Sequence, residues 1–250
     1  MSEAKNETKN IVQSLQRLVL TEVRARLREA PGVRRLLDTA VIKRFLDPNW
    51  ERSRTRWRGA KPDPGLTWGQ ELTGEAFVSK VESYASFDDE TTVLEIGPGY
   101  GRILRSFLAR GIPFKEYYGL DISEQNVEYL RKQFPQDAVH FIRANIAGAP
   151  LPFQFDVGFS SLVFKHLYPS FEAALRNCSR YMSPHGRLIF DLIEGDQRRW
   201  KSEGKSYVRR YRRDEVLEIL GKVGLELVAF DEVVHDPKHR RLLVVATKPE

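Results

Sequence analysis

Short apolar segments alternate with amphipathic ones from residue 92 to the end of the chain. The apolar segments are rich in Val, Ile, Phe and Tyr, as strands are, whereas the segments between them repeat apolar residues every three or four positions, as helices do. Strands are predicted over 92–97, 116–123, 140–146, 155–164, 186–193, 225–234 and 240–248, and helices over 71–85, 101–111, 123–134, 169–183 and 212–224. This order predicts a doubly wound α/β fold with a mostly parallel, seven-stranded sheet. The short connection between the last two strands predicts a hairpin, so the last strand should run antiparallel.

The first 70 residues have a different pattern. Residues 10–29 place apolar side chains at helical spacing with arginines on the other faces, and residues 33–46 resume this pattern after a Pro-Gly break. Residues 48–70 are rich in Pro, Gly and Arg and contain three tryptophans. We therefore expect an N-terminal helical extension with a Trp-rich loop over 1–70 and an α/β domain over 71–250.

Charge is distributed unevenly between these parts. The chain has 40 Lys and Arg against 34 Asp and Glu, a formal net charge of +6, and residues 1–60 alone hold 14 of the former and 7 of the latter. Residues 10–46 could therefore touch an anionic membrane surface, or they could pack on the domain with solvated arginines. No apolar run approaches the ~18 residues of a membrane span, and no secretory leader is visible. We expect a cytoplasmic protein, with peripheral membrane contact as the alternative.

The stretch VLEIGPGYGRIL contains the first candidate chemistry. Gly97, Gly99 and Gly101 come directly after a predicted strand, at the end where parallel α/β sheets bind ligands. Residues without a Cβ let a ligand approach the backbone closely. No Gly-Lys-Ser/Thr comes next, which excludes a P-loop, and the spacing differs from the dinucleotide fingerprint. Glu95 would repel a pyrophosphate but suits a ligand that carries an ammonium group.

Two further polar residues end the next two predicted strands. Asp121 lies 20 residues after Gly101, where a carboxylate can accept hydrogen bonds from both hydroxyls of a ribose. A turn or helix-cap role is the alternative for Asp121. Asn145 ends the third strand, where its amide could meet an adenine edge.

These residues together resemble the class I S-adenosylmethionine-dependent methyltransferases. The family motif E/D-x-G-x-G-x-G matches residues 95–101, its acidic end of the second strand matches Asp121, and its fourth-strand pattern resembles Phe155-Asp156 through Val163 and His166-Leu167. Asn145 departs from the Asp that many members have there. The resemblance covers about residues 75–250 and implies S-adenosyl-L-methionine as cofactor. The residues that we predict to bind the cofactor are Glu95, Gly97, Pro98, Gly99, Tyr100, Gly101, Asp121, Ile122, Asn145, Ile146, Ser160 and Trp68.

Two aromatic residues have open alternatives. His166 comes after the fourth strand and is the candidate general base, since its ordinary pKa lies near neutrality, but it could equally be a structural hydrogen-bonding residue. Trp68 could close over the sulfonium of the cofactor, or the tryptophans of its loop could anchor the N-terminal helices. No Cys/His spacing indicates a metal site.

The acceptor is less constrained by the sequence. A basic cluster lies after the fifth predicted strand, and its members are Arg198, Arg199, Lys201, Lys205, Arg209, Arg210, Arg212 and Arg213. It favours an anionic acceptor, with a solvated loop and helix start as the alternative. The predicted function is methyl transfer to a small molecule, with oxygen favoured and a glycosyl or lipid-linked acceptor allowed. An RNA methyltransferase and a non-catalytic binding protein of the same fold remain alternatives, although no RNA-binding domain is recognisable and nucleic acid is an unlikely partner.

Overall fold

The structure is a computed structural model that describes residues 57–62, 74–195, 201–203, 206–232 and 241–250, with side chains omitted for 201–207. The chain divides into two units, Met1–Arg52 and Ser53–Glu250. The predicted helices within 10–46, Trp68 and most of the Trp-rich loop lie outside the described residues. All of the described residues belong to the second unit.

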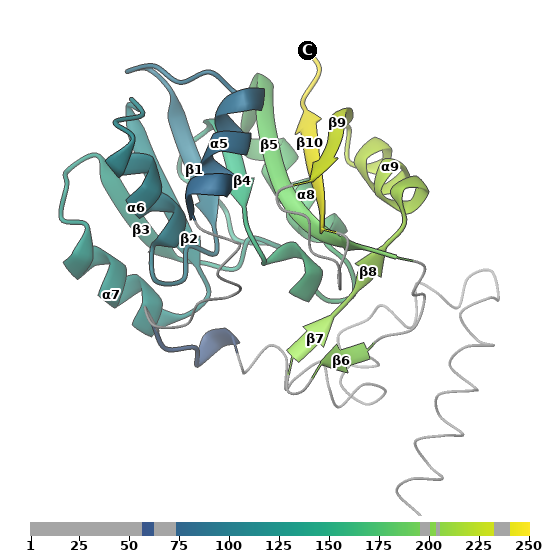
Figure 1. Cartoon of the computed structure of the whole chain (residues 1–250), viewed down its shortest axis with the longest axis horizontal. Coiled ribbons are helices and arrows are strands. Elements are labelled where there is room, and N and C mark those ends of the chain that lie inside the picture. The colour runs from purple at the N-terminus through teal and green to yellow at the C-terminus, as the bar shows by residue number, and fades with distance from the viewer. Residues whose placement is uncertain (1–56, 63–73, 196–200, 204–205, 233–240) are drawn as a thin grey trace, which may run out of the picture. The chain divides into compact units, whose positions relative to one another are not determined.

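A mostly parallel sheet forms the centre of this unit (Figure 1). In spatial order its strands are β3 (Val139–Arg143), β2 (Glu116–Asp121), β1 (Thr92–Ile96), β4 (Phe155–Ser160), β5 (Met182–Glu194), β10 (Arg241–Thr247) and β9 (Glu226–Glu232). β10 is antiparallel to both of its neighbours, whereas the pairs among β1 to β5 are parallel. The predicted doubly wound sheet with an antiparallel last strand is confirmed.

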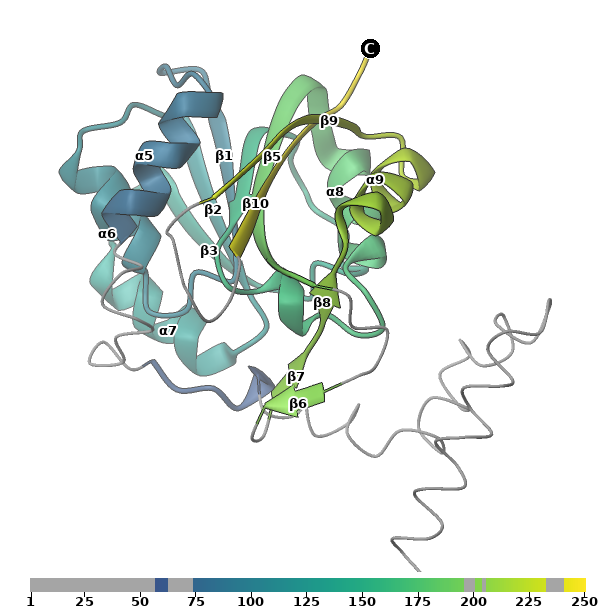
Figure 2. The same cartoon turned by 45° about the vertical axis from the view of Figure 1, so that its right-hand side comes forward.

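Helices cover both faces of the sheet (Figure 2). One buried cluster joins the sheet to α5 (Gly74–Tyr84), α6 (Arg102–Ala109) and α7 (Glu124–Gln133), and the other joins it to α8 (Glu172–Tyr181) and α9 (Arg213–Lys222). Alternation along β1 explains the two cores, because Val93 belongs to the first cluster and Leu94 to the second. The apolar pattern of each strand therefore determines what covers each face.

Several element ends agree with the local sequence. Ser123 caps α7, since its hydroxyl accepts the N–H of Asn126 at 3.3 Å. Gly111 and Gly224 come after α6 and α9 with φ of 64° and 73°, the left-handed conformation that ends helices. Asp214, whose type is common at helix caps, does not cap α9. Arg212 holds the cap position and makes no side-chain cap bond, while Asp214 lies in the first turn.

The structure adds elements that the pattern did not predict. β8 (Arg210–Tyr211) pairs in parallel with the end of β5 as an eighth strand of the main sheet, and β6 (Lys201–Glu203) pairs with β7 (Ser206–Val208) as a separate hairpin. The strand predicted over 155–164 ends at Ser160 and is succeeded by the short 3₁₀ helix η1 (Phe164–His166). The strand predicted over 140–146 ends at Arg143, so Asn145 and Ile146 belong to the loop behind it.

Candidate active site at the carboxyl edge of the sheet

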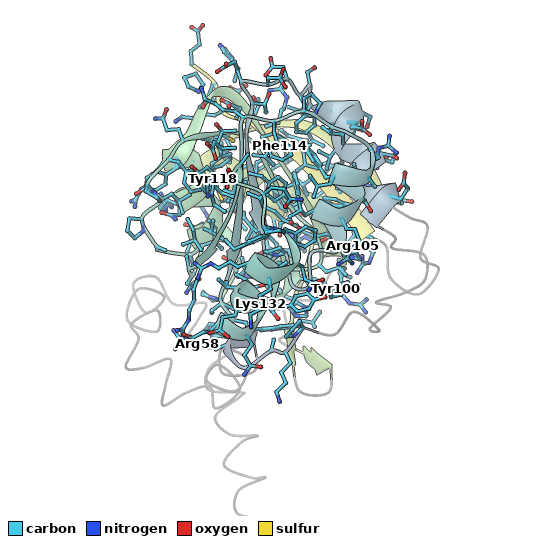
Figure 3. All side chains as sticks on the ribbon, turned by 90° about the vertical axis from the view of Figure 1, so that its left-hand side faces the viewer. Arg58, Tyr100, Arg105, Phe114, Tyr118 and Lys132 are labelled. Atoms are coloured by element: carbon cyan, nitrogen blue, oxygen red, sulfur yellow. The ribbon has the colours of Figure 1, made fainter. Side chains whose placement is uncertain are left out.

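The strand order reverses at β1, which pairs with β2 on one side and β4 on the other. This switch point at the carboxyl ends of the strands is where open α/β sheets bind ligands. Figure 3 shows the two ends of the domain: Phe114, which precedes β2, lies toward the top, and Tyr100, which comes after β1, lies toward the bottom with Arg58. Tyr100, in the loop after β1, thus lies at the end of the domain away from Phe114.

The glycine loop, defined here as Gly97–Gly101, has three left-handed glycines. Their φ values are 73° at Gly97, 61° at Gly99 and 82° at Gly101. A Cβ on Gly97 would lie 2.4 Å from Val163 Cγ2, and a Cβ on Gly101 would lie 2.4 Å from Phe134 Cε2. A Cβ on Gly99 would meet nothing within 4 Å. Two glycines are thus required by protein packing, and the middle one faces open space.

Asp121 ties this loop to the end of β2. Its Oδ2 accepts the N–H of Gly99 at 3.0 Å and the amide of Asn126 at 3.2 Å, and its Oδ1 accepts the N–H of Ser123 at 2.8 Å. Burial raises the pKa of Asp121, while the hydrogen bonds from Ser123, Asn126, Gly99 and Ile122 act in the opposite direction. The turn role that the sequence left as an alternative is therefore present.

Asn126 supplies a second oxygen beside Asp121. Its Oδ1 is buried and has no hydrogen-bond partner in the described part of the chain. A buried amide oxygen without a donor is costly, so a ligand hydroxyl or amine near Asp121 would find a matching acceptor. The sequence pattern did not single out Asn126, although it lies five residues after Asp121 in the helix that Ser123 caps.

Glu95 is buried on the face of the sheet that α6 covers. Its exposed fraction is 2%, and the Tyr117 hydroxyl donates to its Oε2 at 2.6 Å. Burial raises the pKa of Glu95 to about 7, against the opposing effects of the Tyr117 hydrogen bond and the Arg102 charge. A carboxyl group with this pKa releases its proton easily when a cation approaches. Its predicted role toward an ammonium group is compatible with this environment.

The segment after β4, Ser161–His166, forms the next side of the site. Ser160 donates its hydroxyl to the Ile96 carbonyl at 2.9 Å, and Arg102 Nη2 donates to Ser161 Oγ at 3.1 Å. His166 ends η1 and lies beside Trp57, with ring centroids 4.7 Å apart and ring planes at 46°. The end of β4 is thus joined to the residues on either side of the glycine loop.

Residues 57–62 lie across the same edge. Besides the contact between Trp57 and His166, the Ala60 carbonyl accepts the Ser123 hydroxyl at 2.6 Å. The segment therefore connects the start of α7, next to Asp121, with η1, next to β4. Trp68, the tryptophan predicted to close the site, lies outside the described residues, whereas Trp57, from the described part of the same loop, contacts the predicted site residue His166.

The remaining predicted cofactor residues have mixed surroundings. Asn145 is exposed, and its Oδ1 accepts the N–H of Ala147 at 3.1 Å, so the oxygen expected for an adenine amino group already has a local partner. Ile146 is 4% exposed within the core, Pro98 is buried, and Ile122 is half-buried. Tyr100 is half-buried in the glycine loop.

The basic cluster after β5 is largely used in internal ion pairs. Arg209 pairs with Glu215, Arg212 pairs with Asp214 at 2.7 Å, and Arg213 pairs with Glu194 at 2.8 Å. Arg210 has no acidic partner within the described residues. The side chains of the earlier members lie outside the described part. Most of the described positive charge is thus compensated, which leaves Arg210 as the candidate contact for an anionic group.

Two charged residues of the site, the half-buried Arg102 and the buried Asp191, escaped the sequence pattern. Burial lowers the pKa of Arg102, at the start of α6, against the charges of Tyr100, Glu95 and Asp191. Burial raises the pKa of Asp191, in β5, against Arg241, the Leu162 amide, Lys165 and Arg102. A charged residue inside the apolar run IFDLI was the available signal for Asp191. In the stretches that the structure describes, no group of three or more His, Cys, Asp and Glu is placed to hold a metal ion.

Comparison with known proteins agrees with this geometry. Residues 94–190 match a family model described as a methyltransferase domain. The fatty-acid O-methyltransferase of Mycolicibacterium smegmatis is 29% identical over 101 residues, which cover 39% of this chain and 35% of that protein. The malonyl-[acyl-carrier protein] O-methyltransferase of Priestia megaterium is 27% identical over 107 residues, which cover 43% of this chain and 38% of that protein. The chain thus matches little more than a third of the length of these relatives.

Solved structures share the fold at low sequence identity. The Burkholderia thailandensis 1,6-didemethyltoxoflavin-N1-methyltransferase, solved with bound 1,6-didemethyltoxoflavin and S-adenosylhomocysteine, has a TM-score of 0.63 at 18% identity. The match covers 80% of this chain and 89% of that chain. The likeness extends over most of the described unit and supports the architecture derived above.

Proposed function

Because residues 94–190 match a methyltransferase domain and the fold is shared with a methyltransferase solved with S-adenosylhomocysteine, we propose that the chain transfers a methyl group from S-adenosyl-L-methionine to an oxygen of a small-molecule acceptor. One observation carries the proposal. At the switch point of the sheet, Gly99 faces open space with φ of 61°, and its N–H is bound by the carboxylate of Asp121. A ligand can therefore lie against the backbone beside an acceptor of hydroxyl hydrogen bonds.

The residues of the carboxyl edge fit this cofactor in their chemistry. Asp121 and the buried Asn126 oxygen are acceptors for ribose hydroxyls, and Glu95 suits the ammonium of the methionyl part. Gly97–Gly101, with Pro98 and Tyr100, would border the methionyl part, and Ile122, Asn145 and Ile146 would border the adenine. The bound cofactor supplies a methyl group on a good leaving group, so the protein's tasks are alignment of the two reactants and exclusion of water.

A carboxylate is the acceptor that we favour. The two relatives named above are a fatty-acid O-methyltransferase and a malonyl-[acyl-carrier protein] O-methyltransferase, and Arg210 offers a positive charge without an acidic partner in the described part. A carboxylate is already ionised at neutral pH, so its methylation needs no general base. His166 would then orient the acceptor, whereas a hydroxyl acceptor would require His166 to take its proton.

Binding of the product S-adenosylhomocysteine tests the cofactor site without knowledge of the acceptor. We expect titration calorimetry to show binding by the wild-type protein and a loss of at least about tenfold for Asp121→Ala, since the ribose hydroxyls lose their acceptor and the Gly99 N–H loses its partner. Asp137→Ala, at an exposed aspartate, is the matched control and should bind like the wild type. Equal affinity of the wild type and Asp121→Ala would contradict the assignment of Asp121.

Transfer of labelled methyl groups tests the acceptor. Saturated fatty acids, their alcohols and host RNA would be offered separately to the full chain. Label in the fatty-acid esters, retained in His166→Ala, supports a carboxylate acceptor. Label in the alcohols that His166→Ala abolishes would instead indicate a hydroxyl acceptor with His166 as base. Incorporation into RNA alone would overturn the proposal of a small-molecule acceptor.

A further inference from the structure

Asp191 is a buried carboxylate at the carboxyl end of β5, and it reaches the loop after β4. It is 3% exposed, and its Oδ1 accepts the N–H of Leu162 at 2.6 Å. Its Oδ2 accepts Nη1 of Arg241 at 3.2 Å, and Arg241 is itself 8% exposed. A buried carboxylate needs such partners to remain in the core. Asp191 thus connects β10, β5 and the loop after β4.

Leu162 has an unusual backbone conformation for its residue type. Its φ is 69°, in the left-handed region that favours glycine and is unfavourable for a side chain with a Cβ. A non-glycine residue keeps such a conformation only when its surroundings enforce it. The short, charge-assisted hydrogen bond from its N–H to Asp191 is a contact of that kind.

The turn at Leu162 determines what the loop presents to the glycine loop. Val163 is the next residue, and it packs so closely on Gly97 that a Cβ on Gly97 would lie 2.4 Å from Val163 Cγ2. Phe164 is fully buried against Phe190, with ring centroids 4.6 Å apart. On the other side of the turn, Ser161 accepts the hydrogen bond from Arg102, the first residue of α6. The loop after β4 therefore supports the glycine loop from two directions.

We propose that Asp191 is a positioning residue: it holds the left-handed turn at Leu162 and thereby keeps the glycine loop in the shape that binds S-adenosylmethionine. The effect is indirect, through Val163 and Ser161, and the carboxylate itself does not touch the cofactor. This inference rests on the proposed function for the identity of the ligand. To the proposed function, the inference adds a structural link between the glycine loop and the loop that carries His166.

A double-mutant cycle with Leu162→Gly tests this role. S-adenosylhomocysteine would be titrated into the full-length wild type, Asp191→Ala, Leu162→Gly and the double variant. We expect Asp191→Ala to weaken binding about tenfold in the wild-type background and less than about threefold in the Leu162→Gly background, because glycine adopts this φ without the carboxylate. Asp191→Asn keeps an oxygen for the Leu162 N–H and should bind within about threefold of the wild type.

The control is Glu194→Gln, a carboxylate at the same end of β5 that pairs with Arg213 at 2.8 Å. It should leave the affinity unchanged. Equal losses from Asp191→Ala in both backgrounds, or no loss at all, would overturn the proposal. If Asp191→Ala does not fold, Asp191→Leu combined with Arg241→Met replaces the buried pair by apolar side chains. This pair of changes should weaken S-adenosylhomocysteine binding about tenfold when Leu162 is present and less than about threefold together with Leu162→Gly.

Hydrogen exchange of the ligand-free protein gives an independent readout. Peptides covering 160–166 and 97–103 should exchange faster in Asp191→Ala, while a peptide covering β3 should not change, which separates a local effect from general destabilisation. If the wild type does not bind S-adenosylhomocysteine, the proposed function fails, and exchange alone then decides the role of Asp191. Unchanged exchange at 160–166 would overturn that role.

Discussion

The donor side of the site, formed by β1, β2 and the glycine loop, is built differently from the acceptor side, formed by η1, residues 57–62 and β8. On the donor side Glu95 and Asp121 are 2% and 6% exposed, and each has hydrogen-bond partners within 22 residues of sequence. On the acceptor side, half-exposed groups from distant segments meet, such as Trp57 and His166. The first arrangement is buried and joins residues that lie near one another in the sequence, and the second depends on long-range packing.

This difference has a functional meaning under the proposed activity. Members of one family share the donor, so its site can be specified by a short motif with backbone constraints. Acceptors differ between members, and the surfaces that select them are built from loops on a common scaffold. Changes on the donor side should therefore affect stability and cofactor binding together, whereas changes on the acceptor side should be milder and separable from both.

The largest effect is expected at Gly101. A Cβ there would lie 2.4 Å from Phe134 Cε2 and 2.9 Å from Leu130 Cδ2, and the φ of 82° is strained for alanine. We expect Gly101→Ala to lower the free energy of unfolding by about 2–4 kcal/mol, measured by urea denaturation.

Gly99→Ala is its matched control, because a Cβ there meets nothing within 4 Å. It should lower stability by only about 1 kcal/mol, from backbone strain, and still weaken S-adenosylhomocysteine binding. If Gly101→Ala proved as stable as Gly99→Ala, the close packing described for the donor side would be incorrect.

The next effect concerns the pH dependence of stability through Glu95. Its pKa is about 7 in the folded protein against an ordinary value of 4.5, so between these values the folded state binds the extra proton. The contribution of Glu95 to the free energy of unfolding is therefore fully present below pH 4.5. It is lost as the pH rises through 7, and the loss amounts to up to about 3 kcal/mol.

Urea denaturation of Glu95→Gln at pH 5 and pH 8 checks this expectation. Glutamine keeps an oxygen for the Tyr117 hydroxyl but does not titrate, so the variant should lose less stability than the wild type over this range. The same slope in both proteins would show that Glu95 titrates normally. The description of Glu95 as a buried carboxyl group with a raised pKa would then be incorrect.

The smallest effect is expected on the acceptor side, at Trp57. Its ring contact with His166 should contribute about 1 kcal/mol to the free energy of unfolding, so Trp57→Ala should be mildly destabilised. The affinity for S-adenosylhomocysteine should change less than about threefold, while methyl transfer to the acceptor should fall more.

Trp57→Phe preserves an aromatic ring and serves as the control for packing. Both variants would be compared by calorimetry and by labelled methyl transfer. If Trp57→Ala lost cofactor affinity as strongly as Asp121→Ala, the tryptophan would belong to the donor side, and the division drawn between the two sides would fail.

The fold could be predicted because its evidence is periodic and local. The seven long strands, the amphipathic helices and the Ser123 cap arise from patterns within about 15 residues. β8 could not be found in this way, since two residues are too few for a period and Arg210–Tyr211 is a strand only through pairing with the end of β5.

None of the described helices combines the length and the apolar character of a bilayer crossing.

Part of the site was visible in the sequence for the same reason. Gly97, Gly99, Gly101, Glu95 and Asp121 lie at strand ends whose positions the periodicity predicts, and the structure brings them to one edge. Asn126, Arg102 and Asp191 were missed. Asp191 faces the loop after β4 only because that strand stops at Ser160, although the apolar pattern continues to Phe164.

The sequence by itself determined the alternation of strands and helices, the position of the switch point and the residue types at the donor side. The tertiary structure alone decided which glycines are packed and which is open, which arginines are neutralised, and that a carboxylate in β5 accepts the N–H of a left-handed leucine 29 residues earlier. Periodicity and backbone constraints act between near neighbours in the chain. Burial, charge compensation and close packing depend on residues that only folding brings together.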